Sequence, residues 1–274
     1  MKDLSLARRH ALMASAAALM AAAAHRPAQA APAEHLAVYA RVRGAPNGGT
    51  ALWWISGVIY AKQPGEMAVP LFGVTGASRN TIAPRPDGGL TQTMEEAGYF
   101  TDLADGAILS RWRNPISGAE VVPEPYKMKS VQGIAPDGTV ERPNSPFPVE
   151  VKGAVGRPEI SGDTLWIAEN FSARVALLSP ARDGRPPDIV PGQSRVIDSL
   201  ATFQARTADA MNPDAAFVPA TLAFQETDPW FGWMGMGERQ GLQLWQLKGR
   251  KLRTPDELPP PLAQRLKADY PEFL

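Results

Sequence analysis

Apolar side chains recur at every second position in several segments of this chain. Successive side chains of a β-strand point to opposite faces of a sheet, so this spacing predicts strands that bury one face. Turn sequences rich in glycine, asparagine and proline separate the segments at intervals of roughly ten to twenty residues. The chain is therefore expected to fold mainly from antiparallel strands. The alternating sets are Leu52, Trp54, Val58 and Tyr60; Leu165, Ile167, Phe171, Val175 and Leu177; and Leu222 with Phe224.

Helical signal is scarce, and its clearest instance is at the C-terminus. Three prolines at 259–261 precede Leu262, Leu266 and Tyr270 at four-residue spacing, which predicts one short helix there. Residues 198–211 fit a strand followed by a loop better than a helix, because threonines interrupt the apolar positions and no clean cap precedes them.

We predict a single domain over residues 31–274. Proline-rich stretches at 143–148, 180–191 and 255–261 are interpreted as surface loops, since a cut at the first would leave two halves with few strands each. A closed antiparallel sheet would bury one face of every strand and hide its edges. The predicted fold class is all-β, mainly antiparallel: one β-barrel-like domain of calycin type with a short C-terminal helix.

The first thirty residues have the features of an export signal. Arg8 and Arg9 precede an uncharged run at 11–24, and residues 28–30 are the small-residue pattern that a signal peptidase reads. The arginine pair is similar in part to a twin-arginine motif, with a general secretory signal as the alternative. The run is about 14 residues long, shorter than the roughly 20 that span a bilayer. We expect cleavage after Ala30, no membrane anchor in the mature chain, and a periplasmic or secreted protein.

The amino-acid composition argues against several kinds of catalytic and metal-binding site. The chain has no cysteine, and its three histidines, His10, His25 and His35, all lie in the first 35 residues. A thiolate nucleophile, a disulfide framework, a Ser-His-Asp triad and a histidine metal site are therefore not expected. Residues 31–274 carry 24 basic and 27 acidic side chains, so the surface offers no general attraction to nucleic acid or anionic lipid. No metal or cofactor is expected.

Two glutamates fall where the alternation calls for apolar side chains. Glu169 shares its parity with Phe171, and Glu226 shares its parity with Phe224, so both carboxylates are expected to face a core or cavity. A buried carboxylate costs several kcal/mol unless it is paired or neutral, and the neutral case suits proton transfer. Both are candidate catalytic residues; a strand bulge or a structural Arg–Glu pair is the alternative. The partners expected from strand geometry are Arg111, Arg113 and Arg174.

Aromatic side chains are the second candidate feature. The chain has seven tryptophans, which would either fill a barrel interior or line a ligand cavity, and residues 228–233 concentrate aromatic groups beside an acid. We place the mouth of any cavity near that segment. The candidate ligand-binding residues are Trp54, Tyr60, Tyr99, Arg111, Trp112, Asn114, Asp228, Trp230 and Trp233.

Short motifs spread over most of the mature chain together resemble one protein family. They include Ile55-Ser56-Gly57-Val58-Ile59-Tyr60, Pro70-Leu71-Phe72-Gly73-Val74, Tyr99-Phe100-Thr101-Asp102, Ile108-Leu109, Trp112-Arg113-Asn114-Pro115-Ile116-Ser117-Gly118, Trp233-Met234-Gly235-Met236-Gly237, Leu258-Pro259 and Asp269-Tyr270-Pro271-Glu272-Phe273-Leu274. The set is similar to the DUF1838 family of uncharacterised bacterial and fungal proteins. Residues 102–106 depart from the turn expected in that family. The resemblance implies a shared fold and export, and it brings no established activity or catalytic residue.

Two functions of different classes follow from these features. One is binding of a small, mostly apolar molecule inside the barrel, with proton-transfer chemistry of isomerase, hydratase or cyclase type as its extension. The other is a non-catalytic structural or protein-interaction module of the cell envelope, in which the tryptophans are core. An enclosed cavity lined by aromatic and acidic side chains would favour the first, and a solid interior would favour the second. The sequence gives no indication of oligomeric state.

Overall fold

The computed structural model describes residues 28–29, 34–141, 149–178 and 189–274. The expected export signal and the cleavage position after Ala30 fall almost entirely outside these residues. Only Ala28–Gln29 of that segment is described, as the short strand β1 that pairs with β9. No helix within the described ranges is long and apolar enough to cross a bilayer.

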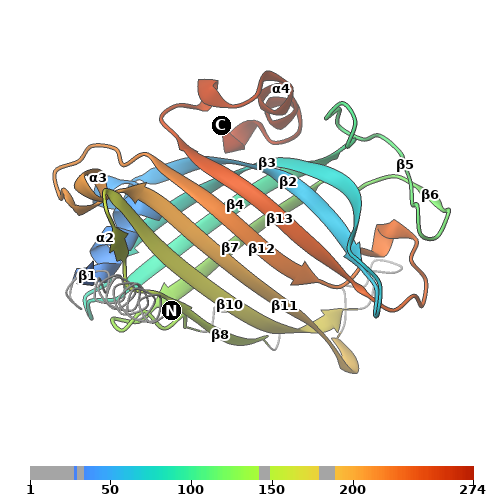
Figure 1. Cartoon of the computed structure of the whole chain (residues 1–274), viewed down its shortest axis with the longest axis horizontal. Coiled ribbons are helices and arrows are strands. Elements are labelled where there is room, and N and C mark those ends of the chain that lie inside the picture. Colours follow the sequence, from blue (N-terminus) through green and yellow to red (C-terminus); the bar gives the residue numbers. More distant parts are fainter. Residues whose placement is uncertain (1–27, 30–33, 142–148, 179–188) are drawn as a thin grey trace, which may run out of the picture.

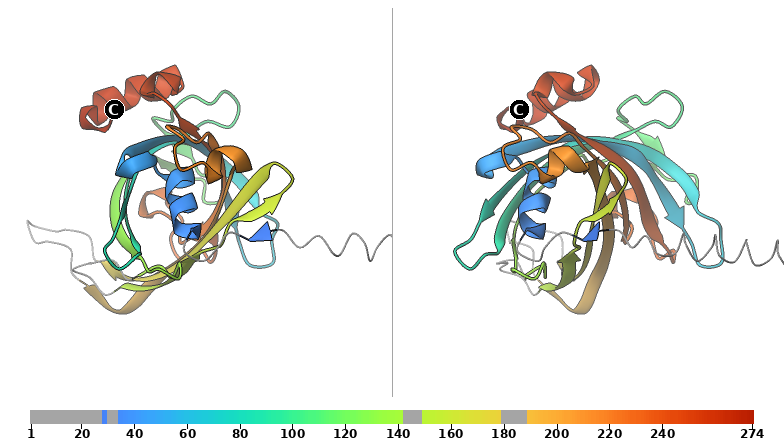
Figure 2. Two further views of the ribbon diagram at one scale, coloured as in Figure 1. Left: turned by 90° about the vertical axis from the view of Figure 1, so that its left-hand side faces the viewer. Right: turned by 60° about the vertical axis from the view of Figure 1, so that its left-hand side comes forward.

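One strongly curled antiparallel sheet forms most of the molecule (Figures 1 and 2). It has eleven strands in the order β1-β9-β10-β11-β12-β13-β2-β3-β4-β7, with β8 paired to β10. The long strands are β2 (Thr50–Lys62), β3 (Val69–Pro84), β4 (Leu90–Thr101), β7 (Tyr126–Ile134), β10 (Thr164–Leu178), β11 (Ile189–Arg206), β12 (Ala220–Asp228) and β13 (Leu242–Leu252). The shorter ones are β8 (Val149–Val155) and β9 (Glu159–Ser161), and β5 (Trp112–Arg113) with β6 (Glu120–Val121) makes a separate hairpin. The predicted fold class is confirmed.

The sheet curls like half of a barrel and is not closed along its length. In the described part of the chain, β7 pairs only with β4, and β8 pairs only with β10. Two isolated bridges, Ile134 with Val140 and Thr139 with Ala154, join the two edges at one end. The sheet is therefore a half-barrel and not the closed sheet that was expected, although the barrel-like fold class holds.

Helix α2 (His35–Arg43) fills one end of the half-barrel, as the blue helix in Figure 2 shows. Val38, Tyr39 and Val42 on it are fully buried. The sequence analysis did not predict this helix. Its chain begins without a side-chain cap and contains β-branched and aromatic residues, which weaken the helical signal.

The predicted C-terminal helix is α4 (Pro260–Asp269), and it lies on the outer face of the sheet (Figures 1 and 2). Its Leu262 and Leu266 are buried against that face, as the four-residue spacing predicted. Residues 198–211 form the end of β11 and the five-residue helix α3 (Thr207–Met211). Short 3-10 turns occur at η1 (Pro46–Gly48), η2 (Gly232–Met234), η3 (Pro255–Glu257) and η4 (Pro271–Phe273).

Two apolar clusters fill the two ends of the half-barrel. One joins α2 to the sheet through Tyr39, Trp53 and Phe203, whose rings meet edge to face. The other surrounds Phe72 and Phe100 and includes the η2 segment and the β5–β6 hairpin. The space between the two clusters is the site described next.

Candidate functional site

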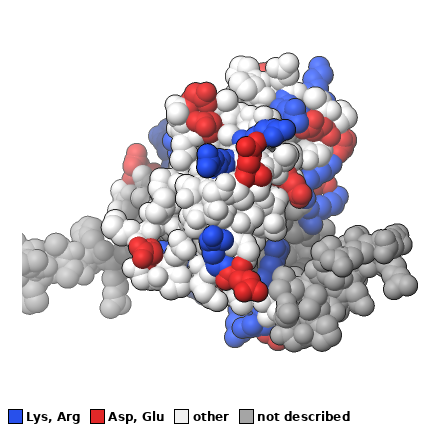
Figure 3. Space-filling view, turned by 90° about the vertical axis from the view of Figure 1, so that its right-hand side faces the viewer, with Lys and Arg blue, Asp and Glu red and all other residues white. Residues whose placement is uncertain are grey.

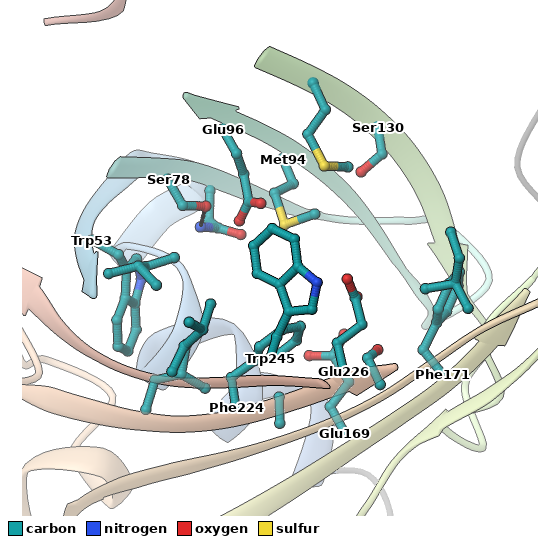
Figure 4. Close-up of a pocket in the computed structure, with 18 of the residues that line it drawn as sticks. Trp53, Ser78, Met94, Glu96, Ser130, Glu169, Phe171, Phe224, Glu226 and Trp245 are labelled. Atoms are coloured by element: carbon teal, nitrogen blue, oxygen red, sulfur yellow. Dashed lines mark hydrogen bonds between the residues drawn. The ribbon is translucent and has the colours of Figure 1, made fainter. Parts of the chain in front are cut away.

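A cavity of about 460 Å³ lies on the concave side of the sheet, between the two apolar clusters (Figure 4). Its walls are mostly apolar and aromatic, and a volume of this size is typical of a site for a small organic molecule. Strands from both halves of the sheet contribute side chains to it. The lining residues that the following paragraphs use are Arg43, Trp53, Ser78, Glu96, Tyr126, Glu169, Arg195, Phe203, Glu226, Asp228 and Trp245.

Glu169 lines the cavity, as its parity predicted, and its carboxylate is held by α2. The hydroxyl of Tyr39 donates to Glu169 Oε2 at 2.9 Å, and Arg43 Nη1 lies 3.5 Å from the same oxygen. With its amide oxygen facing Arg43, Gln92 accepts from Arg43 Nε at 2.7 Å and donates to the Tyr39 hydroxyl at 3.0 Å. Burial, reinforced by the charge of Glu169, raises the pKa of Tyr39 well above its ordinary value, so Tyr39 acts as a neutral donor.

The arginines predicted to pair with the buried glutamates do not do so. Arg111 forms an exposed ion pair with Glu120, and Arg174 lies 3.8 Å from Glu150 on the surface. Arg113 is exposed in β5. Strand geometry missed the true partner because Arg43 comes from a helix about 130 positions earlier in the chain, beside Tyr39 in the same network.

Glu226 and Asp228 also line the cavity, and they lie two residues apart on β12, so their side chains share one face. Burial raises the pKa of Glu226 to about 8, and the nearby charges of Asp228 and Glu96 add to the shift. Burial likewise raises the pKa of Asp228, against an opposing effect of Arg195. Glu226 is therefore largely neutral at pH 7.

Glu96, on β4, is a further acidic residue of the cavity that the sequence analysis missed. In Figure 4 it enters from the wall opposite Glu226, with the indole of Trp245 between them in that view. Burial raises its pKa, while a hydrogen bond from the Ser78 hydroxyl lowers it. A signal was present in the sequence, because Glu96 shares its parity with the apolar Met94 on the same strand.

Two polar atoms at the cavity have no hydrogen-bond partner within the described structure. They are the indole nitrogen Nε1 of Trp245 and Oδ1 of Asp228, and their residues are only 7% and 8% exposed. An unpaired buried donor or acceptor costs free energy that a suitable ligand group would recover. The residues of the cavity wall therefore include one unpaired buried donor and one unpaired buried acceptor among mostly apolar side chains.

Two predicted ligand residues of β2, Trp54 and Tyr60, do not line the cavity. Trp54 packs with the α4 cluster on the outer face and donates from Nε1 to Thr75 Oγ1 at 3.2 Å. Its neighbour Trp53 points inward instead. The inner and outer faces of β2 could not be distinguished from the sequence. Because α4 covers the outer face there, the side chains on both faces of the strand are apolar. The buried positions of β2 stay odd-numbered along the strand, with Ile59 and Ala61 buried, so Tyr60 shares the parity of Trp54 and not that of Trp53.

Other predicted ligand residues also lie outside the cavity wall. Asn114 is fully buried at the β5–β6 hairpin, where it donates to the carbonyl of Met234 at 2.8 Å, and Trp112, Trp230 and Trp233 pack around it in the second apolar cluster. Tyr99 lies under α4 and donates to Asp269 Oδ2 at 3.0 Å. Of the eleven residues singled out in the sequence, the structure brings Glu169, Glu226 and Asp228 together at the cavity.

On the face drawn in Figure 3, basic and acidic side chains are interspersed. Among the residues that the structure describes, no group of three His, Cys, Asp or Glu is placed to hold a metal ion.

Comparison with protein-family models places the chain in a family. The family model described as a protein of unknown function (DUF1838) matches residues 48–274, which covers most of the chain and leaves α2 outside. No curated protein matches the sequence.

Proposed function

We propose that this chain, which belongs to the DUF1838 family, binds a small, mostly apolar molecule with a polar end in the cavity of its half-barrel. The observation that carries the proposal is the cavity itself: about 460 Å³ between two apolar clusters, with an unpaired donor and an unpaired acceptor in its wall. Such a combination fits an apolar body oriented by few polar contacts. A structural module that only needed a stable core would gain by filling this space.

Binding is tested with N-phenyl-1-naphthylamine, a neutral apolar dye whose fluorescence rises in apolar surroundings, and by native mass spectrometry of the purified protein. We expect saturable dye binding at one site. Ser130→Trp should abolish it, because Ser130 on β7 faces the cavity and a tryptophan there would fill it. The matched control is Val131→Trp on the same strand, whose side chain is 48% exposed. Equal binding by both variants would refute the proposal.

We also propose that the protein acts outside the cytoplasm, after export by the arginine-pair signal in residues 1–30. The support is the sequence pattern of that segment alone. Mass spectrometry of the exported protein should give an N-terminus at or near Ala31. Replacing Arg8 and Arg9 with lysine should block export if the protein uses the twin-arginine route. Unchanged export of this variant would support the general secretory alternative.

A second candidate function is proton transfer by Glu226 to or from the bound molecule. It is supported by the pKa of about 8 that burial gives this carboxyl, because an acid that is neutral near physiological pH can both donate and accept a proton. In this proposal Glu169 keeps a structural role, since Tyr39 and Arg43 already hold its carboxylate. With a turned-over ligand in hand, Glu226→Gln should lower the rate by about 10²–10⁴ with little change in binding of a neutral ligand.

A further inference from the structure

The cavity is lined by more acidic than basic side chains, and its basic side chains are either already paired or exposed to solvent. Four carboxyl groups line it, on Glu96, Glu169, Glu226 and Asp228, against two arginines, Arg43 and Arg195. Arg43 is engaged by Glu169 and by the oxygen of Gln92. Arg195 is exposed. Among the described residues, none of the other three carboxyl groups forms an ion pair within 4 Å, although the charge of Arg43 acts on Glu96 and that of Arg195 on Glu226 and Asp228.

The unpaired acceptor lies among these three groups. Oδ1 of Asp228 has no hydrogen-bond donor although the residue is 8% exposed. Glu226 shares the same face of β12, and Glu96 approaches from the opposite wall in Figure 4. A ligand group that carried N–H donors and a positive charge would satisfy Asp228 and lie between carboxyl groups from two sides.

The aromatic side chains of the cavity suit the same kind of group. Trp53, Tyr126 and Trp245 line it, and the faces of such rings attract cations. The protein already uses this interaction at the cavity wall, where the Arg43 guanidinium lies 4.8 Å from the centre of the Phe203 ring. An anionic ligand would meet the three carboxyl groups and find only an arginine that is already engaged and one that is exposed.

We infer that the ligand is a hydrophobic cation: a compact apolar body with one protonated amine, held by Glu226 and Asp228 inside the aromatic walls of the cavity. This inference rests on the proposed binding function and names the ligand class. The raised pKa of Glu226 does not oppose it, because an adjacent cation favours the ionised carboxylate, and the proton leaves as the amine binds.

The test uses three probes of one shape and different charge: 1-adamantanamine, 1-adamantanol and 1-adamantanecarboxylate. Binding to the full-length mature protein is measured by calorimetry near pH 7 and by displacement of N-phenyl-1-naphthylamine. We expect the amine to bind about tenfold more tightly than the alcohol, and the carboxylate to bind most weakly. Alcohol binding equal to or tighter than amine binding, or preferred carboxylate binding, would overturn the inference and leave the proposed apolar site standing.

Two variants identify the residues responsible. Glu226→Gln and Asp228→Asn should each reduce the advantage of the amine over the alcohol by about threefold to tenfold, while the affinity for the alcohol stays the same. Glu124→Gln, at an exposed position, is the charge-matched control and should change neither affinity. If both cavity variants still bound the amine more tightly than the alcohol by the wild-type factor, other groups would be responsible for that preference. This result would overturn the inference. If none of the three probes nor the dye binds, the proposed function fails together with it.

Discussion

The hydroxyl of Tyr39 and the carboxylate of Glu169 are hydrogen-bonded at 2.9 Å although 130 residues separate them along the chain. This contact joins the helix that fills one end of the half-barrel to strand β10. Arg43, one turn further along α2, lies 3.5 Å from the same carboxylate oxygen. Glu169 is thus satisfied by the helix, and Glu96, Glu226 and Asp228 are the other carboxyl groups that line the cavity.

We predict that Arg43 and Glu169 are strongly coupled in stability. Arg43→Met and Glu169→Gln should each lower the free energy of unfolding by about 3 kcal/mol, because each leaves a buried partner unsatisfied. The double variant should lose less than the sum of the two. Urea denaturation of the four proteins measures the coupling. The exposed pair Arg111 and Glu120 is the control, with an expected coupling of about 0.5 kcal/mol, and additive losses at the buried pair would contradict the prediction.

Stability should fall as the pH rises through the neutral range, in part because of Glu226. Its pKa rises from 4.5 to about 8 on folding, so the folded state keeps a proton that the unfolded state has lost between these values. Raising the pH between these two values therefore lowers the free energy of unfolding. The effect levels off above the pKa that Glu226 has in the folded state.

Glu226→Gln should weaken that dependence and be more stable than the wild type by about 2 kcal/mol near pH 9. The slope should not vanish, since burial also raises the pKa of Glu96 and Asp228. Urea titrations at about pH 5, 7 and 9 give the comparison. Identical slopes in this variant and the wild type would show that Glu226 is already ionised in the empty cavity.

Two inward tryptophans should respond differently to replacement by phenylalanine. Trp53 donates from Nε1 to the carbonyl of Arg43 at 2.8 Å, whereas Nε1 of Trp245 has no partner. Trp53→Phe leaves a carbonyl unpaired, so it should cost about 1–2 kcal/mol more than Trp245→Phe, which removes an unpaired donor. Thermal and urea unfolding of the ligand-free variants measure the difference. Equal losses would mean that packing alone governs both sites.

Lys251 should hold α2 in place from the sheet. Its Nζ donates to the carbonyl of Arg41 at 2.7 Å and to that of Val42 at 3.2 Å, the last turn of the helix. Lys251→Met should destabilise the protein by about 1–3 kcal/mol and increase hydrogen exchange of the α2 amides, because those buried carbonyls lose their donor. Lys248→Met, at an exposed position of β13, should leave exchange unchanged. If hydrogen exchange of the α2 amides were the same in Lys251→Met as in the wild type, Lys251 would not hold the helix in place.

The strands and the inward direction of two glutamates could be predicted because each depends on local alternation. Leu165 and Ile167 fix the parity of β10, and Glu169 follows it without a break. The same reasoning failed in β2, where α4 covers one face and the cavity lies on the other. Trp53 and Trp54 are then both surrounded by apolar groups, and adjacent residues of a strand cannot be ranked by hydrophobicity alone.

The partner of Glu169 could not be predicted from sequence. Its identity depends on where α2 docks, which is set by tertiary contacts of Tyr39 and Val42 and by no periodic signal. The position of Asn114 had the same cause, since its burial depends on contact with Met234 from a distant turn. Residue types were sufficient to find carboxyl groups facing inward, and the assembled fold was needed to show which of them is paired.

One of the two arginines that line this interior comes from a segment outside the residues that match the family model. Residues 48–274 match the family model, and the nine-residue α2, with Tyr39 and Arg43, precedes them. Exchanging this one helix for another of the same length would remove the hydroxyl and the guanidinium that contact Glu169, while every strand kept its sequence. The polar groups of the cavity wall therefore depend on the N-terminal helix as well as on the strands, so substitutions in α2 would alter the site.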